Sequence, residues 1–162
     1  MSSQRIFGVT GWKNAGKTTL TERLVEEFVR RGWRVSTIKH AHHDIDIDRP
    51  GTDSYRHRAA GAGEVALVGG RRYAIMREAP EPSISEVLGR LSPADLVLIE
   101  GYKREAHLKI EVRASPEAEP LAPGDPAIVA IAADYQPTGG ALPWFRRDDI
   151  AAIADFIARR TG

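Results

Sequence analysis

Residues 11–18 read Gly-Trp-Lys-Asn-Ala-Gly-Lys-Thr and match the pattern G-x-x-x-x-G-K-[ST] at every fixed position. In this pattern, backbone amides and the N-terminus of a helix surround a phosphate group. The arrangement works only between a buried strand and a helix. An apolar run, residues 6–9, precedes the motif, and an amphipathic stretch begins at Thr19 and Leu20. The sequence therefore predicts a strand, a phosphate-binding loop and a helix in succession.

The residue types of the loop define its ligand. Gly11 and Gly16 allow backbone angles closed to other residues and let amides approach phosphate oxygens. Lys17 adds a positive charge between the β- and γ-phosphates, and the Thr18 hydroxyl is a ligand for Mg²⁺. We therefore expect a nucleoside triphosphate or diphosphate. The predicted binding residues are Gly11, Trp12, Lys13, Asn14, Ala15, Gly16, Lys17, Thr18 and Thr19.

Length and composition predict one soluble domain over residues 1–162, and the loop motif makes it a P-loop nucleotide-binding domain. The net charge of +1 gives no reason to expect binding to nucleic acid or to an anionic membrane. Zero cysteines exclude disulfides and thiolate metal sites. The chain shows neither a signal peptide nor an apolar run long enough to span a membrane, so we expect a cytoplasmic protein.

The order of elements predicts an α/β fold. Apolar residues recur at helical spacing after the loop up to Gly32, and a β-branched run, residues 33–39, forms the next strand. Further expected elements are helices over residues 54–60, 83–91 and from 150, and strands over residues 64–68, 73–77, 95–100, 107–113 and 127–132. Asp53 is the expected cap of the first of these helices and Ser83 that of the second. Gly69-Gly70 predicts a hairpin turn. The fold is expected to be a P-loop NTPase, with a mostly parallel sheet flanked by helices and an inserted antiparallel hairpin.

Glu100 ends a strand, residues 95–100, that is apolar throughout its interior. Open α/β sheets bind ligands at the carboxyl ends of their strands, which is where Glu100 lies, whereas Asp95 lies at the opposite end. We therefore predict that Glu100 contacts Mg²⁺ directly or through water and takes part in catalysis. The alternative is an ordinary exposed carboxylate at a strand end.

A polar segment after the second strand, residues 40–53, concentrates His40, His42 and His43 with Asp44, Asp46 and Asp48. Three interpretations stay open: a switch loop near the γ-phosphate, a solvated or partner-facing loop, and a transition-metal site. In the first, Asp48 or Asp53 takes a Mg²⁺-bound water and Lys39 or a histidine faces phosphate. Asp48 is accordingly a predicted metal ligand and catalytic residue.

Three stretches together resemble the molybdopterin-guanine dinucleotide biosynthesis protein B family. They are the loop at residues 11–18, the segment from Lys39-His40-Ala41-His42-His43 through Pro50-Gly51-Thr52-Asp53-Ser54 to Ala60-Gly61-Ala62, and Leu98-Ile99-Glu100-Gly101-Tyr102-Lys103. The resemblance covers nearly the whole chain, and the middle stretch is its most specific part. It implies a GTP-binding, weakly hydrolysing adapter that uses Mg²⁺. It also implies a homodimer that assists the nucleotidyltransferase attaching GMP to molybdopterin, with molybdopterin itself as a candidate ligand.

Two positions depart from related patterns. In similar dimeric P-loop proteins a loop lysine serves the neighbouring subunit, but Lys13 stands at the third loop position rather than the second, so its role in cis or in trans stays open. The usual guanine signature [NT]-K-x-D is absent. Its nearest substitute is Ala132-Ala133-Asp134, where Asp134 is the predicted acceptor for the guanine N1 and N2 donors.

Two other functions use the same residues. A small-molecule kinase would employ the phosphate loop with Asp48 or Asp53 as the base toward an acceptor hydroxyl. A protein-binding module would use the nucleotide only to order residues 40–53 and the hairpin. The first hypothesis is a GTP-binding adapter centred on Lys17, Thr18 and Glu100. Its hydrolysis should be slow without a partner, because no arginine finger or water-positioning glutamine can be identified from the sequence.

Overall fold

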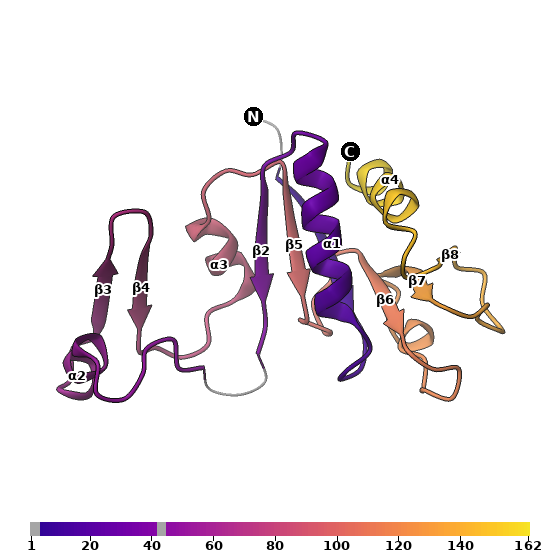
Figure 1. Cartoon of the computed structure of the whole chain (residues 1–162). Helices are drawn as coiled ribbons and strands as arrows, with labels where there is room; N and C mark the ends of the chain where they lie inside the picture. The colour runs from indigo at the N-terminus through magenta and orange to yellow at the C-terminus, as the bar shows by residue number, and fades with distance from the viewer. Residues whose placement is uncertain (1–3, 42–44) are drawn as a thin grey trace. The chain divides into compact units, whose positions relative to one another are not determined.

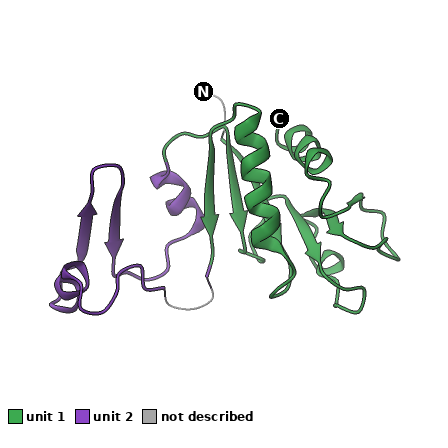
Figure 2. Cartoon of the chain, in the orientation of Figure 1, with its two compact units in different colours: residues 1–40, 92–162 green, residues 41–91 purple. Residues whose placement is uncertain are grey.

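The computed structural model describes residues 4–41 and 45–162 and contains two compact units (Figure 2). The first comprises Met1–His40 and Ser92–Gly162, and the second comprises Ala41–Leu91. Within the described residues, no helix has both the length and the apolar content that a membrane span requires. The phosphate loop and Glu100 both belong to the first unit, whereas Asp48 belongs to the second.

A six-stranded sheet of order β2-β5-β1-β6-β7-β8 forms the first unit, and all its strand pairs are parallel (Figure 1). Its strands are β1 Arg5–Thr10, β2 Val35–Lys39, β5 Leu96–Glu100, β6 Lys109–Arg113, β7 Ile128–Ala133 and β8 Trp144–Phe145. The parallel sheet predicted from the sequence is confirmed. Strand β8 was not predicted, since two residues are too few to show an alternating pattern.

One face of this sheet is covered by α1, Lys17–Arg30, and α4, Ile150–Thr161, which lie side by side in Figure 1. Leu24 and Phe28 of α1 and Ile153 of α4 are fully buried against strand residues such as Phe7 and Ile110. Because the side chains of a strand alternate between the two faces, Ile110 and Val112 enter this core while Lys109 and Glu111 point to the opposite face.

The opposite face of β6 carries charged side chains that are almost fully buried. Lys109 pairs with Asp125 at 2.6 Å. Glu111 accepts hydrogen bonds from the amides of Leu121 and Ala122 at 2.8 and 3.0 Å. These bonds hold residues 114–127, which include the short 3₁₀ helix Ala122–Gly124, against the sheet. The segment expected to be a plain loop is therefore fixed by buried charges that find partners.

His107 precedes Lys109 on the same face, and its imidazole packs against the backbone of β1. A methyl group added to Gly8 would lie 2.6 Å from its Nε2, so only glycine fits beneath the ring. Both ring nitrogens are buried, and neither has a hydrogen-bond partner among the described residues. Burial, with a smaller contribution from Lys109, lowers the pKa of His107 to about 4.

This histidine makes stability depend on pH. The unfolded chain takes up the proton near pH 6.5, the ordinary value, while the folded chain takes it up only near pH 4, so stability is lost as the pH falls through this window. We expect the free energy of unfolding to drop by about 2 kcal/mol between pH 7 and pH 5 through this group. Urea titrations of wild type and His107→Phe at both pH values isolate the effect. An equal drop in the variant would contradict it.

The second unit contains α2 Asp53–Ala59, the antiparallel hairpin β3 Glu64–Val68 and β4 Tyr73–Arg77, and α3 Ile84–Arg90. The hairpin strands have the predicted bounds, and Gly69 donates to Arg72 across the turn. The predicted capping box of Ser83 and Glu86 is confirmed. The predicted cap Asp53 is wrong: Thr52 caps α2 through its hydroxyl, which accepts from the Tyr55 amide, and Asp53 is the first helical residue.

Candidate nucleotide-binding site

The phosphate loop connects the carboxyl end of β1 to the N-terminus of α1, as predicted. Gly11 has φ +148°, and a methyl group there would lie 2.5 Å from the Val112 carbonyl oxygen. Gly16 has φ +99° and precedes the first helical residue. The first intrahelical bond of α1 runs from the Leu20 amide to the Gly16 carbonyl, so the amides of the preceding turn are left for an anion. The backbone angles expected of the two glycines are therefore confirmed.

Lys17 lies inside the curve of this loop. Its ammonium group donates to the Trp12 carbonyl at 2.7 Å. Burial lowers the pKa of Lys17; the positive charges of Lys103 and Lys39 act in the same direction, while Glu100 opposes them. The ammonium groups of Lys17, Lys39 and Lys103 and the one carboxylate of Glu100 together carry a net positive charge, which a polyphosphate would neutralise.

Thr18 and Glu100 meet next to Lys17. The Thr18 hydroxyl donates to Glu100 Oε1 at 2.8 Å, and Lys39 Nζ lies 3.6 Å from the same oxygen. The parallel register explains this meeting, because Glu100 is aligned with both Lys39 of β2 and Val9 of β1. A hydroxyl and a carboxylate are the hard oxygen ligands that Mg²⁺ prefers, and its remaining positions are usually taken by water and phosphate. The side chains at these two positions therefore fit a magnesium ion.

The remaining loop residues differ in exposure. Ala15 is buried, while Trp12, Lys13 and Asn14 are exposed, and Asn14 takes a left-handed backbone conformation with φ 61°. The Trp12 indole N–H donates to the Glu119 carbonyl at 2.7 Å. Lys103, which was not among the predicted site residues, places its ammonium 4.2 Å from the centre of the Trp12 ring.

Asp134 lies at the end of β7, beside a cavity of about 280 Å³ that also borders Gly16, Thr19 and Arg23. Its carboxylate accepts from Arg147 Nε at 2.9 Å, and this bond lowers the pKa of Asp134. Arg147 Nη1 also donates to the Ala15 carbonyl at 3.2 Å. Arg147 therefore joins the phosphate loop to the predicted base-recognition residue. No local sequence pattern indicates this role, because the contact joins segments that are 132 residues apart.

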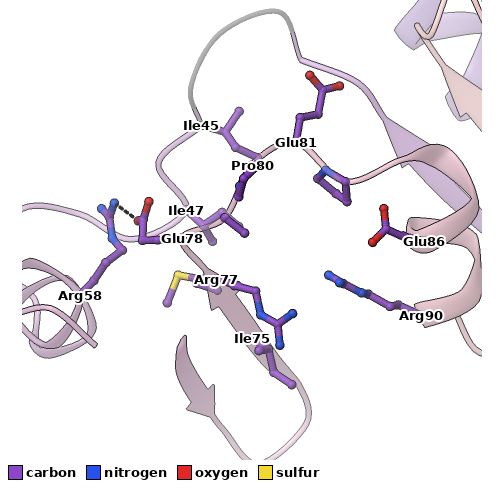
Figure 3. A pocket seen from close by; sticks show the side chains of 13 residues that line it. Ile45, Ile47, Arg58, Ile75, Arg77, Glu78, Pro80, Glu81, Glu86 and Arg90 are labelled. Carbon is purple, nitrogen blue, oxygen red and sulfur yellow. Dashed lines mark hydrogen bonds and ion pairs between the residues drawn. The ribbon is translucent and has the colours of Figure 1, made fainter. Parts of the chain in front are cut away.

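Asp48, which was also predicted to be a catalytic residue and a metal ligand, belongs to the second unit. The Asp48 carboxylate accepts a hydrogen bond from Arg58 at 2.9 Å, and the Arg58 guanidinium also binds Asp46 and Glu78. Arg58 and Glu78 border a cavity of about 640 Å³, together with Ile47 and residues from β4 to α3 (Figure 3). The contacts of Asp48 within this unit are structural, and its proposed roles toward Mg²⁺ and catalysis stay predictions.

The histidine-rich segment is described only in part. His42, His43 and Asp44 lie outside the described residues, and His40 stacks on Tyr102 with 4.3 Å between ring centres. In the part of the chain that the structure describes, no three His, Asp or Glu side chains come together to hold a metal ion. Lys39 lies 3.6 Å from Glu100, and its contact with phosphate in the switch-loop interpretation stays a prediction.

Residues 6–134, which contain the loop, Glu100 and Asp134, match the model of the family Molybdopterin guanine dinucleotide synthesis protein B. The chain belongs to this family. The matched range spans the second unit and the first unit up to Asp134.

Related proteins extend the match over almost the full length. The chain is 39% identical over 155 residues to the molybdopterin-guanine dinucleotide biosynthesis adapter protein of Haemophilus influenzae, covering 94% of this chain and 86% of that protein. It is 35% identical over 160 residues to the protein of the same name in Escherichia coli, covering 94% and 90%. A crystal structure of a MobB homolog from Bacillus stearothermophilus aligns with a TM-score of 0.73 and 30% identity over 96% of this chain and 97% of that one.

Proposed function

We propose that this protein is a GTP-binding adapter in the biosynthesis of molybdopterin-guanine dinucleotide. The observation that carries the proposal is the meeting of Lys17, Thr18 and Glu100 at a phosphate loop of the required backbone conformation. The relatives named as adapter proteins of this pathway support the biological setting. The nucleotidyltransferase that attaches GMP to molybdopterin is the proposed partner.

The site favours binding and slow hydrolysis over rapid catalysis. Thr18 and Glu100 would hold Mg²⁺, which neutralises charge that develops on the phosphate oxygens. Lys17 would hold the β- and γ-phosphates in place. Arg147, the arginine beside the loop, is bonded to Asp134 and to the Ala15 carbonyl, so it is not free to stabilise a transition state at the γ-phosphate. A partner would have to supply this charge for faster turnover.

A small-molecule kinase is the weaker alternative. That function needs a base for the acceptor hydroxyl, and its first candidate, Asp48, has its carboxylate bonded to Arg58. The Asp48 side chain is also only 3% exposed, so an acceptor hydroxyl could not reach it. No observation in the site favours the kinase.

Guanine would lie in the cavity beside Asp134. This residue follows β7, and the cavity continues along Gly16 and Thr19, so a nucleotide with its phosphates in the loop would place its base there. The carboxylate would accept from the two guanine donors, which adenine does not present in this arrangement. Because the Asp134 side chain is 46% exposed, we expect moderate discrimination rather than that of a buried site.

Calorimetric titration with GTP and ATP in Mg²⁺ tests this proposal. We expect GTP to bind about ten-fold more tightly than ATP, and Asp134→Asn to bring the two affinities close together, since an amide replaces one acceptor by a donor. Asp148→Asn is the matched control, because Asp148 borders the same cavity and pairs with Arg146, and it should keep the preference. Equal binding of both nucleotides to wild type would refute guanine selectivity.

The homodimer is likewise proposed for this chain. The hairpin of the second unit leaves large apolar side chains exposed, among them Leu67, Val68, Tyr73 and Ile75. A two-stranded ribbon has two open edges and is only marginally stable alone, so pairing with a second copy would bury these side chains.

A further inference from the structure

A second cavity adjoins the phosphate loop at its Trp12 end. Its volume is about 590 Å³, within the range of small-molecule sites. It lies entirely within the first unit and shares no lining residue with the cavity beside Asp134. Its lining residues include Thr10, Trp12, Lys103, Glu119 and Asp125.

The walls of this cavity are held by a buried lysine. Lys109 Nζ donates to the Lys103 carbonyl at 3.0 Å on one wall and to Asp125 Oδ2 at 2.6 Å on the other. Glu111 fixes the adjoining backbone through the amides of Leu121 and Ala122. A fully buried ammonium bonded to both walls keeps the space open, so the site is formed in advance of any ligand.

Thr10 supplies an observation that itself indicates a ligand. It is the last residue of β1, is 1% exposed and lines the cavity, and its hydroxyl has no hydrogen-bond partner among the described residues. A buried hydroxyl left without a partner is destabilising. A ligand atom within the cavity would satisfy it.

The opening of the cavity is aromatic and charged. The indole of Trp12 is fixed by its bond to the Glu119 carbonyl and remains 42% exposed, so it offers a rigid surface for stacking. The ammonium of Lys103 lies 4.2 Å from the ring centre and can neutralise an anionic group. Glu119 and Asp125 also line the cavity. The two Asp125 oxygens accept from Lys109 and from the Ala127 amide, and a carboxylate has further lone pairs that can accept from a ligand.

We propose that this cavity binds a fused 2-amino-4-oxopyrimidine of the pterin class with an anionic side group. Its amino and ring N–H groups would donate to the carboxylates, a ring acceptor would bond the Thr10 hydroxyl, and its flat face would stack on Trp12. Guanine has the same pyrimidine edge, but the proposed function already places guanine beside Asp134. The inference rests on that function: the pathway product named by the relatives contains both a guanine and a pterin.

Fluorescence titration with pterin-6-carboxylate tests the proposal on the full-length chain. We expect one pterin per chain, bound also when Mg²⁺ and GTP are saturating, since the two cavities share no lining residue. Thr10→Val, which removes only the hydroxyl, should weaken binding about five-fold. Thr37→Val, an exposed substitution on β2, is the matched control and should have no effect.

Lys103→Gln is a second variant, which tests the proposal even if Thr10→Val folds poorly. In wild type, unsubstituted pterin should bind more weakly than pterin-6-carboxylate, and in Lys103→Gln the two should bind alike. Displacement of the probe by GTP would overturn the proposal, as would undiminished binding to a folded Thr10→Val or no binding to wild type. Pterin binding without GTP binding would instead refute the proposed function alone, because the two ligands are measured separately.

Discussion

Replacing Lys17 by alanine is expected to weaken GTP binding about a hundred-fold, which corresponds to about 2.7 kcal/mol. The ammonium group is the main fixed charge inside the loop, and its bonds to phosphate oxygens would be charge-assisted. Its removal should cost little folding stability, because its hydrogen bond in this structure is to the Trp12 carbonyl at the surface. The expected loss is therefore one of affinity and not of structure.

Calorimetry with GTP in Mg²⁺ measures this change, and a thermal melt of the variant checks that it is folded. Arg159→Ala is the matched control, since Arg159 is an exposed cation of the same unit at the end of α4. It should bind GTP as wild type does. Undiminished GTP binding to Lys17→Ala would show that the nucleotide binds outside this loop.

Glu100→Gln is expected to slow GTP hydrolysis at least a hundred-fold while changing GTP affinity less than about ten-fold. The carboxylate contributes charge where Mg²⁺ would be held, whereas the phosphate tail is held mainly by backbone amides and Lys17. Glutamine keeps the size of the side chain, and its carbonyl can still accept from Thr18. Glu100→Ala should likewise affect hydrolysis more than binding.

Single-turnover phosphate release over a range of Mg²⁺ concentrations measures the rate of GTP hydrolysis, and calorimetry measures the GTP affinity. Glu26→Gln, an exposed position on α1, is the matched control and should match wild type in both. If Glu100→Gln lost affinity and hydrolysis to the same degree, Glu100 would have a structural role instead.

The central part of the site could be predicted from sequence because local patterns and parallel topology determine it. The loop motif indicates Lys17 and Thr18, and an apolar strand ending in an acid indicates Glu100. Once β1 and β5 are neighbours in a parallel sheet, their carboxyl ends must meet, which brings Thr18 and Glu100 within 2.8 Å. The antiparallel hairpin was equally predictable from its glycine turn and flanking runs.

The residues that sequence reasoning missed act through contacts between distant segments. Arg147 reaches Ala15 and Asp134, Lys103 covers Trp12, and Thr10 lines a cavity closed by residues 119–128. Lys103 ends one of the family stretches, but no motif or periodicity indicates any of these contacts. The wrong cap at Asp53 has a different cause: Thr52 and Asp53 are both good capping residues, and only the backbone conformation separates them.

The most direct test of the account is a crystal structure with a non-hydrolysable GTP analogue and Mg²⁺. The account predicts the β- and γ-phosphates within the loop against Lys17, the metal bound through the Thr18 hydroxyl with Glu100 beside it, and the base next to Asp134. Electron density for the analogue anywhere other than the loop, or a metal without contact to Thr18 or Glu100, would contradict it.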